Sequence, residues 1–307
     1  MLEHKKEIRF ALTNRCNFDC VFCHNEGMCK KETYPQNPTP KDYGFITDVA
    51  SRCFDIKKFV LTGGEPLILK DIIDIAKEIK KNGGEHITLI TNGSLLSKKK
   101  NILKEIDEIH ISLGTLDKEK YQNRTNSGID PKQVKKTIEE ISKDFKNIKL
   151  NVIMLDSENK DCGNILELID FAKKLNIELY LIEYFPEDNT FYFSFRKIEK
   201  LISSLGYIRS REEENKVLFV KKKSPNIKIV FVPCAFVDSP LVSDPENYCK
   251  ANQSIYILPN FSIQPCFLNQ NSKISIYDSI KEKDEGEFIR LIKIARAQTG
   301  CNCPLTF

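Results

Sequence analysis

The feature that most constrains this chain is a repeated alternation of short β-branched runs with helical patterns, at a spacing of about 30 residues. The segments that predict strands are 8–12, 57–62, 86–91, 108–113, 148–155 and 177–184. Helical periodicity lies between them, for example at 70–81 and 131–145. Strands that alternate with helices form a parallel sheet with crossover helices. We therefore expect an α/β fold, either an open doubly wound sheet or a partial (β/α)6 barrel.

This alternation stops near Gly206, a glycine at a turn. Two further apolar runs, 217–223 and 227–232, predict the strands of a hairpin. An irregular segment rich in proline and asparagine then continues to residue 307. Our interpretation is a barrel unit over residues 1–206 and a smaller C-terminal unit over residues 207–307.

The composition narrows the class of protein. A chain of 307 residues buries a large core without disulfides, yet this one carries 11 cysteines. It has no apolar run long enough for a membrane span or a signal peptide, so we expect a cytoplasmic protein. Clustered thiols in that compartment bind metal more often than they form disulfides. The net charge of +4 gives no sign of a nucleic-acid or membrane partner.

Cys16, Cys20 and Cys23 place three thiols on one short loop after the first predicted strand. Polar residues around them disfavour simple packing in a core. A structural zinc site normally closes with four ligands, and the nearest further candidates are Cys29 and His24. Three thiolates with an open fourth position suit an iron–sulfur cluster in which one iron can bind another molecule. Zinc remains the alternative.

The other polar motifs also follow predicted strands. They are Gly63-Gly64-Glu65-Pro66, Thr91-Asn92-Gly93, Ser112 with Asp117, and Glu183. In both candidate folds the chemistry lies at the carboxyl ends of the strands. The paired glycines allow the backbone to approach a ligand closely, and the Glu65 carboxylate can accept hydrogen bonds from an ammonium group.

The run CNFDCVFC at 16–23 resembles the CxxxCxΦC signature of radical S-adenosylmethionine (SAM) enzymes, with Phe22 as the aromatic member. GGEP at 63–66 resembles the motif that receives the methionine amino group in that family. The resemblance implies that Cys16, Cys20 and Cys23 hold a [4Fe–4S] cluster whose open iron binds SAM. By the same resemblance, an electron from the cluster would cleave SAM to a 5′-deoxyadenosyl radical, which would take a hydrogen atom from the substrate.

The same resemblance implies the residues that bind SAM and the source of the electron. The cofactor-binding positions would be Phe22, Gly63, Gly64, Glu65, Pro66, Thr91, Asn92, Ser112 and Phe185. The electron donor would be a small protein such as a flavodoxin or a ferredoxin.

Within the superfamily the chain resembles the GTP 3′,8-cyclases of molybdenum-cofactor biosynthesis, through residues 8–23 and YLIEYFP at 180–186. This likeness implies that Arg9, Lys149 and Glu183 contact substrate. Several positions depart from that family's pattern. Val60, Ser254 and Tyr256 stand where it has arginines, Asn252 replaces a cluster cysteine, and the chain ends in CNCPLTF without paired glycines. Lost arginines weaken phosphate binding, so these departures argue against GTP as the substrate.

The C-terminal unit offers a second set of thiols, Cys249, Cys266, Cys301 and Cys303. Four thiolates are enough to close a second [4Fe–4S] cluster or a zinc site. The pattern is similar to the short auxiliary-cluster "twitch" segment of radical aminocyclitol dehydrogenases. A cluster held entirely by protein would move an electron or order the tail.

The remaining cysteines have separate interpretations. Cys53 and Cys162 are expected to be buried and to act as small hydrophobes. Cys234 is a candidate hydrogen-atom donor, because some radical epimerases return a hydrogen atom from a cysteine.

The sequence therefore predicts a radical SAM enzyme with two [4Fe–4S] clusters that acts on a small polar molecule, such as a sugar, an aminocyclitol or a nucleotide derivative. Dehydrogenation and epimerisation are the expected reactions. Three alternatives remain: cyclisation of GTP, modification of a peptide, and a zinc-stabilised binding module without enzymatic activity.

Overall fold

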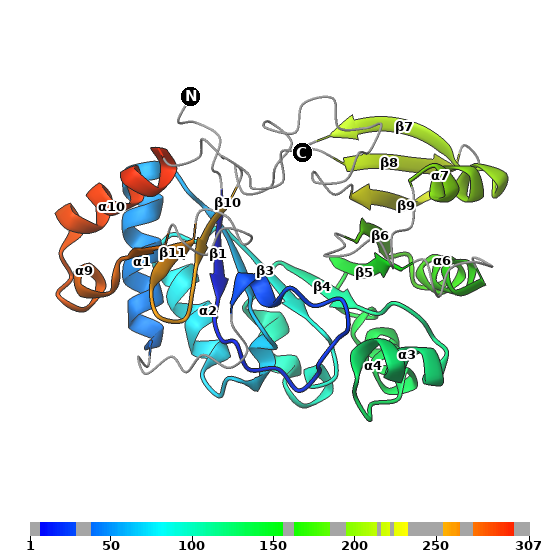
Figure 1. Ribbon diagram of the computed structural model, residues 1–307, viewed down its shortest axis with the longest axis horizontal. Helices are drawn as coiled ribbons and strands as arrows, with labels where there is room; N and C mark the ends of the chain where they lie inside the picture. Colours follow the sequence, from blue (N-terminus) through cyan, green and yellow to red (C-terminus); the bar gives the residue numbers. More distant parts are fainter. Residues whose placement is uncertain are drawn as a thin grey trace.

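The computed structural model describes residues 7–28, 38–155, 163–184, 195–213, 216–221, 224–232, 254–264 and 273–297. Within these ranges a single sheet runs through the molecule in the order β12-β11-β10-β1-β2-β3-β4-β5-β6-β9-β8-β7 (Figure 1). Its strands are β1 Glu7–Ala11, β2 Lys58–Thr62, β3 His86–Thr91, β4 Glu108–Ser112, β5 Ile148–Met154, β6 Glu178–Glu183, β7 Ile208–Glu213, β8 Lys216–Lys221, β9 Ser224–Val232, β10 Ser254–Ile257, β11 Ser262–Gln264 and β12 Ile274–Ser275.

The centre of this sheet is parallel. Strands β1 to β6 pair in sequence order, β10 adds in parallel to β1, and β9 adds in parallel to β6. Antiparallel strands extend both edges, β11 and β12 beyond β10 and β8 and β7 beyond β9. In Figure 1 the strand direction turns from near vertical at β1 to near horizontal at β6. This confirms the predicted α/β fold with crossover helices, and the turn of the sheet agrees with a partial barrel.

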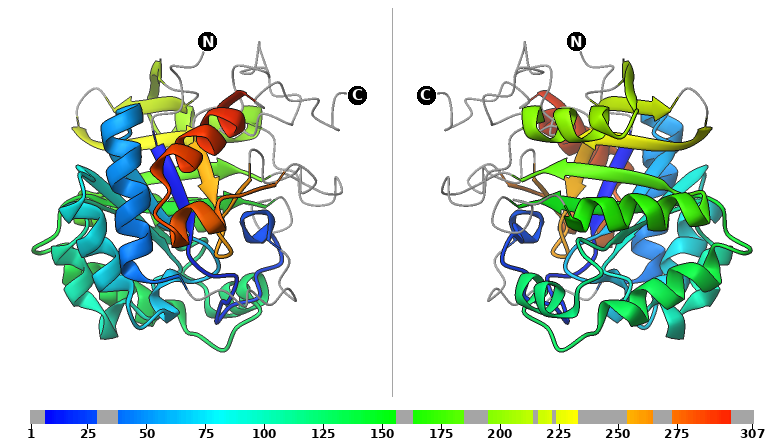
Figure 2. Two further views of the ribbon diagram at one scale, coloured as in Figure 1. Left: turned by 90° about the vertical axis from the view of Figure 1, so that its left-hand side faces the viewer. Right: turned by 90° about the vertical axis from the view of Figure 1, so that its right-hand side faces the viewer.

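Helices connect the strands and lie outside them, as the two views of Figure 2 show. The α-helices are α1 Pro40–Phe54, α2 Ile72–Lys81, α3 Lys118–Thr125, α4 Pro131–Ile141, α6 Gly163–Leu175, α7 Phe195–Ser204, α9 Tyr277–Lys281 and α10 Glu285–Ala297. Short 3-10 turns are η1 Asn25–Gly27, η2 Pro66–Ile68, η3 Leu96–Lys98 and η4 Lys100–Lys104. The predicted helices 70–81 and 131–145 correspond to α2 and α4, whose observed ends lie within a few residues of the prediction.

Alternation along each strand divides the sheet into two faces. One set of side chains, such as Phe10, Leu61 and Leu150, belongs to the hydrophobic core that the helices cover. The residues between them, such as Arg9 and Lys149, point to the opposite face. We call this opposite face the inner face. It is the polar side of the sheet.

The C-terminal part of the chain contributes to both ends of the sheet. Strands β8 and β9 form the hairpin that the sequence predicts, and Gly206 precedes it with a φ of +80° that favours glycine. Because β9 pairs with β6 and β10 pairs with β1, the described strands after residue 206 extend the same sheet from two sides. Division of the chain at residue 206 stays a prediction. Among the described residues no helix is long and apolar enough to cross a membrane.

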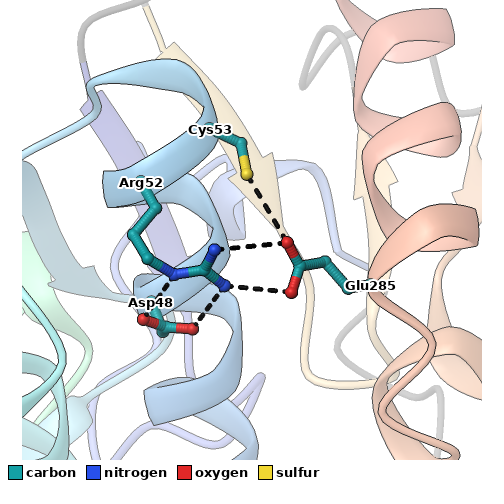
Figure 3. A network of polar contacts seen from close by, with 4 residues as sticks. All are labelled: Asp48, Arg52, Cys53 and Glu285. Carbon is teal, nitrogen blue, oxygen red and sulfur yellow. Dashed lines mark hydrogen bonds and ion pairs between the residues drawn. The ribbon is translucent and has the colours of Figure 1, made fainter.

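Helix α10 is linked to α1 by a surface network of polar contacts (Figure 3). Arg52 donates hydrogen bonds to Asp48 and, from the other side of its guanidinium, to Glu285 at 3.0 and 3.3 Å. The Cys53 thiol lies 3.7 Å from the same Glu285 carboxylate. The expectation that Cys53 is buried was wrong, because the thiol is exposed. It stands off the buried stripe of α1, which follows helical spacing through Ile46 and Ala50.

Candidate active site

The three-cysteine loop follows β1 at the carboxyl edge of the parallel strands. Cys16 and Cys23 are exposed, and Cys20 is half-buried against the core. Backbone N–H groups point at two of the thiols: Phe18 donates to Cys16 Sγ at 3.4 Å, and Asn25 donates to Cys23 Sγ at 3.3 Å. Hydrogen-bond donors of this kind stabilise the thiolate, which is the form of cysteine that binds metal.

Burial raises the pKa of the Cys16 thiol, and the Glu65 carboxylate and Cys23 add to this rise. A thiolate at this position therefore needs a positive partner, which a bound metal cluster supplies. Within the described ranges, no three Cys, His, Asp or Glu side chains are grouped as a single metal ion would need. A cubane cluster places each thiolate on a different iron, so exposed, separate thiols on one loop fit it.

Helix α3 holds the middle of the cysteine loop. The loop N–H groups of Asp19 and Val21 donate to the carbonyls of Thr125 and Arg124, each at 3.0 Å. The buried Arg124 guanidinium lies 5.2 Å from the ring centroid of Phe22, and it donates to the Ile153 carbonyl at 2.8 Å. Phe22, the aromatic member of the signature, is thus fixed by a cation–π contact. The sequence did not single out Arg124, because nothing local links it to Phe22.

The paired glycines bring the turn after β2 against the cysteine loop. Gly64 N donates to the Thr13 carbonyl at 2.6 Å, and Glu65 N donates to the Arg15 carbonyl at 2.9 Å. A Cβ atom at Gly63 would lie 2.5 Å from Thr13 O, and one at Gly64 would lie 2.2 Å from Arg15 O. The backbone at Gly63 and Gly64 therefore lies in close contact with the backbone of Thr13 and Arg15. This contact positions the start of the cysteine loop.

Glu65 is completely buried and holds the turn to β3. Its carboxylate accepts hydrogen bonds from Leu67 N at 3.0 Å, Thr91 Oγ1 at 2.7 Å and Asn92 N at 2.8 Å. Burial raises the pKa of Glu65, while these three donors oppose the rise. A carboxylate has about four acceptor positions, so about one remains. The predicted contact of Glu65 with an ammonium group stays a prediction, and its observed role is to join GGEP to Thr91 and Asn92.

Asn92 extends this connection to the cysteines. Its side-chain nitrogen lies 3.0 Å from Asn17 Oδ1 and 3.9 Å from Cys16 Sγ, and Asn17 in turn donates to Ser94 at 2.9 Å. The loop after β3 is therefore tied to the cysteine loop by side chains on both. Of the predicted SAM-binding residues, the structure brings Phe22, Gly63, Gly64, Glu65, Thr91 and Asn92 together around this loop. Pro66 begins η2 beside them, and Ser112 ends β4 on the inner face.

The end of the cysteine loop connects to the inner face of the barrel. Glu26 in η1 accepts a hydrogen bond from Thr62 at 2.8 Å and lies 3.6 Å from the Arg9 guanidinium. Arg9 also lies 3.6 Å from Glu7 and stacks over Tyr256 at 5.5 Å. The segment that follows the three cysteines thus contacts the inner face at Arg9 and Thr62.

Lys149, the second predicted substrate residue, lies in a compact polar cluster on β4, β5 and β6. Its ammonium is 2.7 Å from Glu108, and Glu108 also contacts the His110 ring. Burial would raise the pKa of Glu108, but His110 and Lys149 lower it to about 2. Burial would lower the pKa of Lys149, but Tyr180 and Glu108 raise it. Burial lowers the pKa of His110 despite Glu108, so the ring is neutral at pH 7.

The sequence analysis missed Glu108 and His110. The signal that could have found them is their spacing of two on a strand, which puts both on the face of Lys149 in the next strand. Glu183, the third predicted substrate residue, is buried and pairs in register with Met154, a core residue. It therefore stands apart from Arg9 and Lys149, and its contact with substrate stays a prediction.

The paired state of Glu108 leads to a pH-dependent stability. A carboxyl with a depressed folded pKa stabilises the fold above its unfolded pKa, and this stabilisation is lost as the pH falls towards the folded value. With a folded pKa of about 2, roughly 2 of about 3 kcal/mol are lost between pH 6 and pH 3. We expect Glu108→Gln to lack this loss. Urea unfolding of both proteins across this range measures it, and parallel pH profiles would contradict it.

Several predicted site residues lie outside the described residues. They are Phe185, Cys234, Cys249, Cys266, Cys301 and Cys303, and the two other cysteines at 29 and 162 lie there as well. His24, which follows the cysteine loop, stacks on Tyr184 at the end of β6 with ring centroids 5.8 Å apart. This contact joins the first and last strands of the six-unit repeat at their carboxyl edge.

Comparison with curated proteins finds GTP 3′,8-cyclases. A probable GTP 3′,8-cyclase from Methanococcus aeolicus is 27% identical over 289 residues, which cover 91% of this chain and 91% of that protein. One from Pyrococcus abyssi is 41% identical over 178 residues, covering 57% of this chain and 56% of its own length. This agrees with the resemblance that the sequence predicts.

Solved structures share the fold. Streptococcus suis SuiB bound to S-adenosylmethionine has a TM-score of 0.68 at 19% identity, over 90% of this chain and 64% of SuiB. The anSMEcpe protein with bound AdoMet has a TM-score of 0.62 at 13% identity, over 94% of this chain and 83% of that chain.

The family model described as the Radical SAM superfamily matches residues 10–172, the stretch that carries the cysteine loop, GGEP and the barrel strands through β5. The predicted cofactors, S-adenosylmethionine and [4Fe–4S] clusters, agree with this match. It extends over more than half of the sequence, and the chain therefore belongs to the Radical SAM superfamily.

Proposed function

We propose that this radical SAM enzyme uses Cys16, Cys20 and Cys23 to cleave S-adenosylmethionine and removes a hydrogen atom from a small polar molecule on the inner face. The observation that supports this most is the continuous hydrogen-bonded path from GGEP through Asn92 to Cys16, together with the contact of Glu26, just after the cysteines, with Arg9 on the inner face. When bound to these thiols, a [4Fe–4S] cluster supplies the electron that breaks the sulfonium bond to give methionine and a 5′-deoxyadenosyl radical.

The protein's own residues position these reactants. The turn at Gly63 and Gly64 fixes the start of the cysteine loop, and Arg124 fixes its aromatic member Phe22. Misplaced groups quench a radical. A loop that is held in one position therefore favours the reaction with substrate more than a flexible loop does.

A second [4Fe–4S] cluster on Cys249, Cys266, Cys301 and Cys303 is part of the proposal. It is supported by the described ends of two strands: Ser254 pairs with Glu7, and Gln264 pairs with Tyr256. These ends lie side by side at the amino edge of β1, and in the sequence Cys249 precedes one while Cys266 follows the other. With all its irons held by protein, this cluster would carry an electron, which a flavodoxin or ferredoxin would supply or accept.

Two reactions are candidates. The names of the curated relatives favour cyclisation of GTP, ahead of the dehydrogenation or epimerisation that the sequence analysis ranked first. Hydrogen abstraction from a sugar or aminocyclitol is the second candidate. It is favoured by Val60, which stands next to Arg9 on the inner face, and by the carboxylates that pair with Arg9 and Lys149.

One labelling experiment tests the proposal. The reconstituted enzyme is reduced with SAM in the presence of GTP that carries deuterium at C3′, and 5′-deoxyadenosine is analysed by mass spectrometry. Deuterium in the 5′-deoxyadenosine supports cyclisation of GTP. Unlabelled 5′-deoxyadenosine, with no GTP-derived product, contradicts cyclisation of GTP and leaves the second candidate. Formation of no 5′-deoxyadenosine above a metal-free control contradicts the proposed function.

A further inference from the structure

Both cations that face the centre of the inner face already have carboxylate partners. Lys149 lies 2.7 Å from Glu108, with side chains only 16% and 14% exposed. Arg9 lies 3.6 Å from each of Glu7 and Glu26, and its side chain is 19% exposed. An exposed ion pair separates at little cost in free energy. When a part-buried ion pair loses one partner, the other charge is left buried and uncompensated, which costs much more.

The charges on this face nearly cancel. Arg9 and Lys149 contribute two positive charges, while Glu7, Glu26 and Glu108 contribute three negative ones. Further ionised groups on the same face whose side chains the structure describes are Lys58, which is exposed at the amino end of β2, and the pair Lys228 and Glu178, 3.5 Å apart. His110 is neutral at pH 7 because burial lowers its pKa. Counted over these described side chains, the inner face thus carries no excess of positive charge.

Asn151 and Arg9 each place on this face a buried polar atom that has no hydrogen-bond partner among the described residues. Asn151 Oδ1 is an acceptor on β5, one step along the face from Lys149, and it lies in register between Ser112 and Tyr180. Arg9 Nε is a donor on β1. A buried acceptor without a donor is costly, and a ligand hydroxyl or amine supplies one. An ionised phosphate supplies acceptors only, so it can satisfy Arg9 Nε but leaves Asn151 unsatisfied.

From these observations we infer that the inner face selects a polar ligand without net negative charge, which presents a hydroxyl or amine donor to Asn151 and a hydroxyl acceptor to Arg9. Glu7, Glu26 and Glu108 are then specificity-determining residues that disfavour polyanions such as a triphosphate. Specificity of this kind comes from repulsion of the wrong ligand as much as from attraction of the right one. The inference rests on the proposed function in taking the inner face as the substrate site, and it favours the sugar or aminocyclitol candidate.

Titration with inorganic tripolyphosphate tests the inference. The full chain, reconstituted with its clusters and with SAM present, is titrated by calorimetry at physiological salt, where weak surface contacts are screened. We expect wild type to bind more weakly than about 1 mM, and Glu108→Gln, which frees Lys149, to bind at least about tenfold more tightly than wild type. Wild-type binding tighter than about 1 mM, or a smaller gain in the variant, overturns the inference.

Two further variants control the experiment. Glu140→Gln removes a carboxylate that pairs with Lys100 on the outer surface at 2.5 Å, so it changes the net charge equally without touching the inner face, and it should bind as wild type does. Glu7→Gln removes one of the two carboxylates that pair with Arg9 and leaves Glu26 in place, so it also tightens binding, by less than Glu108→Gln, and it serves as the test if Glu108→Gln does not fold. A gain in Glu140→Gln equal to that in the inner-face variants would show that only net charge matters and would overturn the inference.

The outcome is separable from that of the proposed function. Formation of 5′-deoxyadenosine by the same preparation reports radical generation, whatever the inner face binds. If the enzyme still cleaves SAM but binds tripolyphosphate tightly, only the inference of charge-based selection is contradicted. Failure to cleave SAM removes the proposed function and leaves the binding result standing.

Discussion

Gly64→Ala is expected to reduce the rate of 5′-deoxyadenosine formation by at least about 100-fold. The added Cβ would lie 2.2 Å from the Arg15 carbonyl oxygen and 2.6 Å from its carbon. Both neighbours are backbone atoms, so no side-chain rotation relieves the clash and the cysteine loop must move away from the turn. The hydrogen bonds from Gly64 and Glu65 to Thr13 and Arg15 would then stretch or break. Rates of SAM cleavage by reconstituted protein measure the effect.

Gly128→Ala is the matched control for this variant. Gly128 lies in the turn between α3 and α4, and a Cβ there meets no atom within 4 Å. The Gly128→Ala protein should cleave SAM at the wild-type rate. Wild-type activity in Gly64→Ala would mean that the turn does not fix the loop, and our account of GGEP would be incorrect.

Cys20→Ala is expected to abolish SAM cleavage and to lower the iron content by about four atoms per chain. Cys20 is half-buried against the core, between the exposed Cys16 and Cys23. Alanine fills nearly the same space, so the fold should persist while one of three thiolates is lost. Two thiolates hold a cubane poorly. The outcome is measured by the iron and sulfide content, the absorbance at about 400 nm and the amount of 5′-deoxyadenosine formed. Each is expressed per protein chain and compared with wild type.

Cys53→Ala is the control, because the Cys53 thiol is exposed on α1 and its described hydrogen-bond partner is Glu285. It should retain the wild-type iron content and activity. If Cys20→Ala kept its iron and still released 5′-deoxyadenosine, the first cluster would have to use other ligands.

Local patterns in the sequence were enough to predict the central strands and the helices between them. The segment 86–91 is β3 itself, because a run of β-branched residues in a buried strand leaves little doubt about its conformation. The places of β9 and β10 were not predictable in this way. Their pairing with β6 and β1 joins residues far apart in the chain, and no local periodicity carries that information.

The candidate site shows the same division. The cysteine spacing and GGEP predict that their residues lie together, and the structure places them around one loop. The partners of each group were not predictable from spacing. Glu65 looked like a group for a ligand, yet its carboxylate is satisfied by Leu67, Thr91 and Asn92. The ion pair of Lys149 with Glu108 depends on the register between β4 and β5, which only the folded sheet defines.

The addition of β9 to β6 and of β10 to β1 has a consequence for how the chain folds during synthesis. Strands β1 to β6 are complete once residue 183 has been made, but each edge of that sheet then offers unpaired backbone groups. Such edges recruit strands from other chains. These two edges are covered only after β9 and β10, residues 224–232 and 254–257, leave the ribosome, so strands made later than the barrel repeat also keep newly made molecules from associating edge to edge.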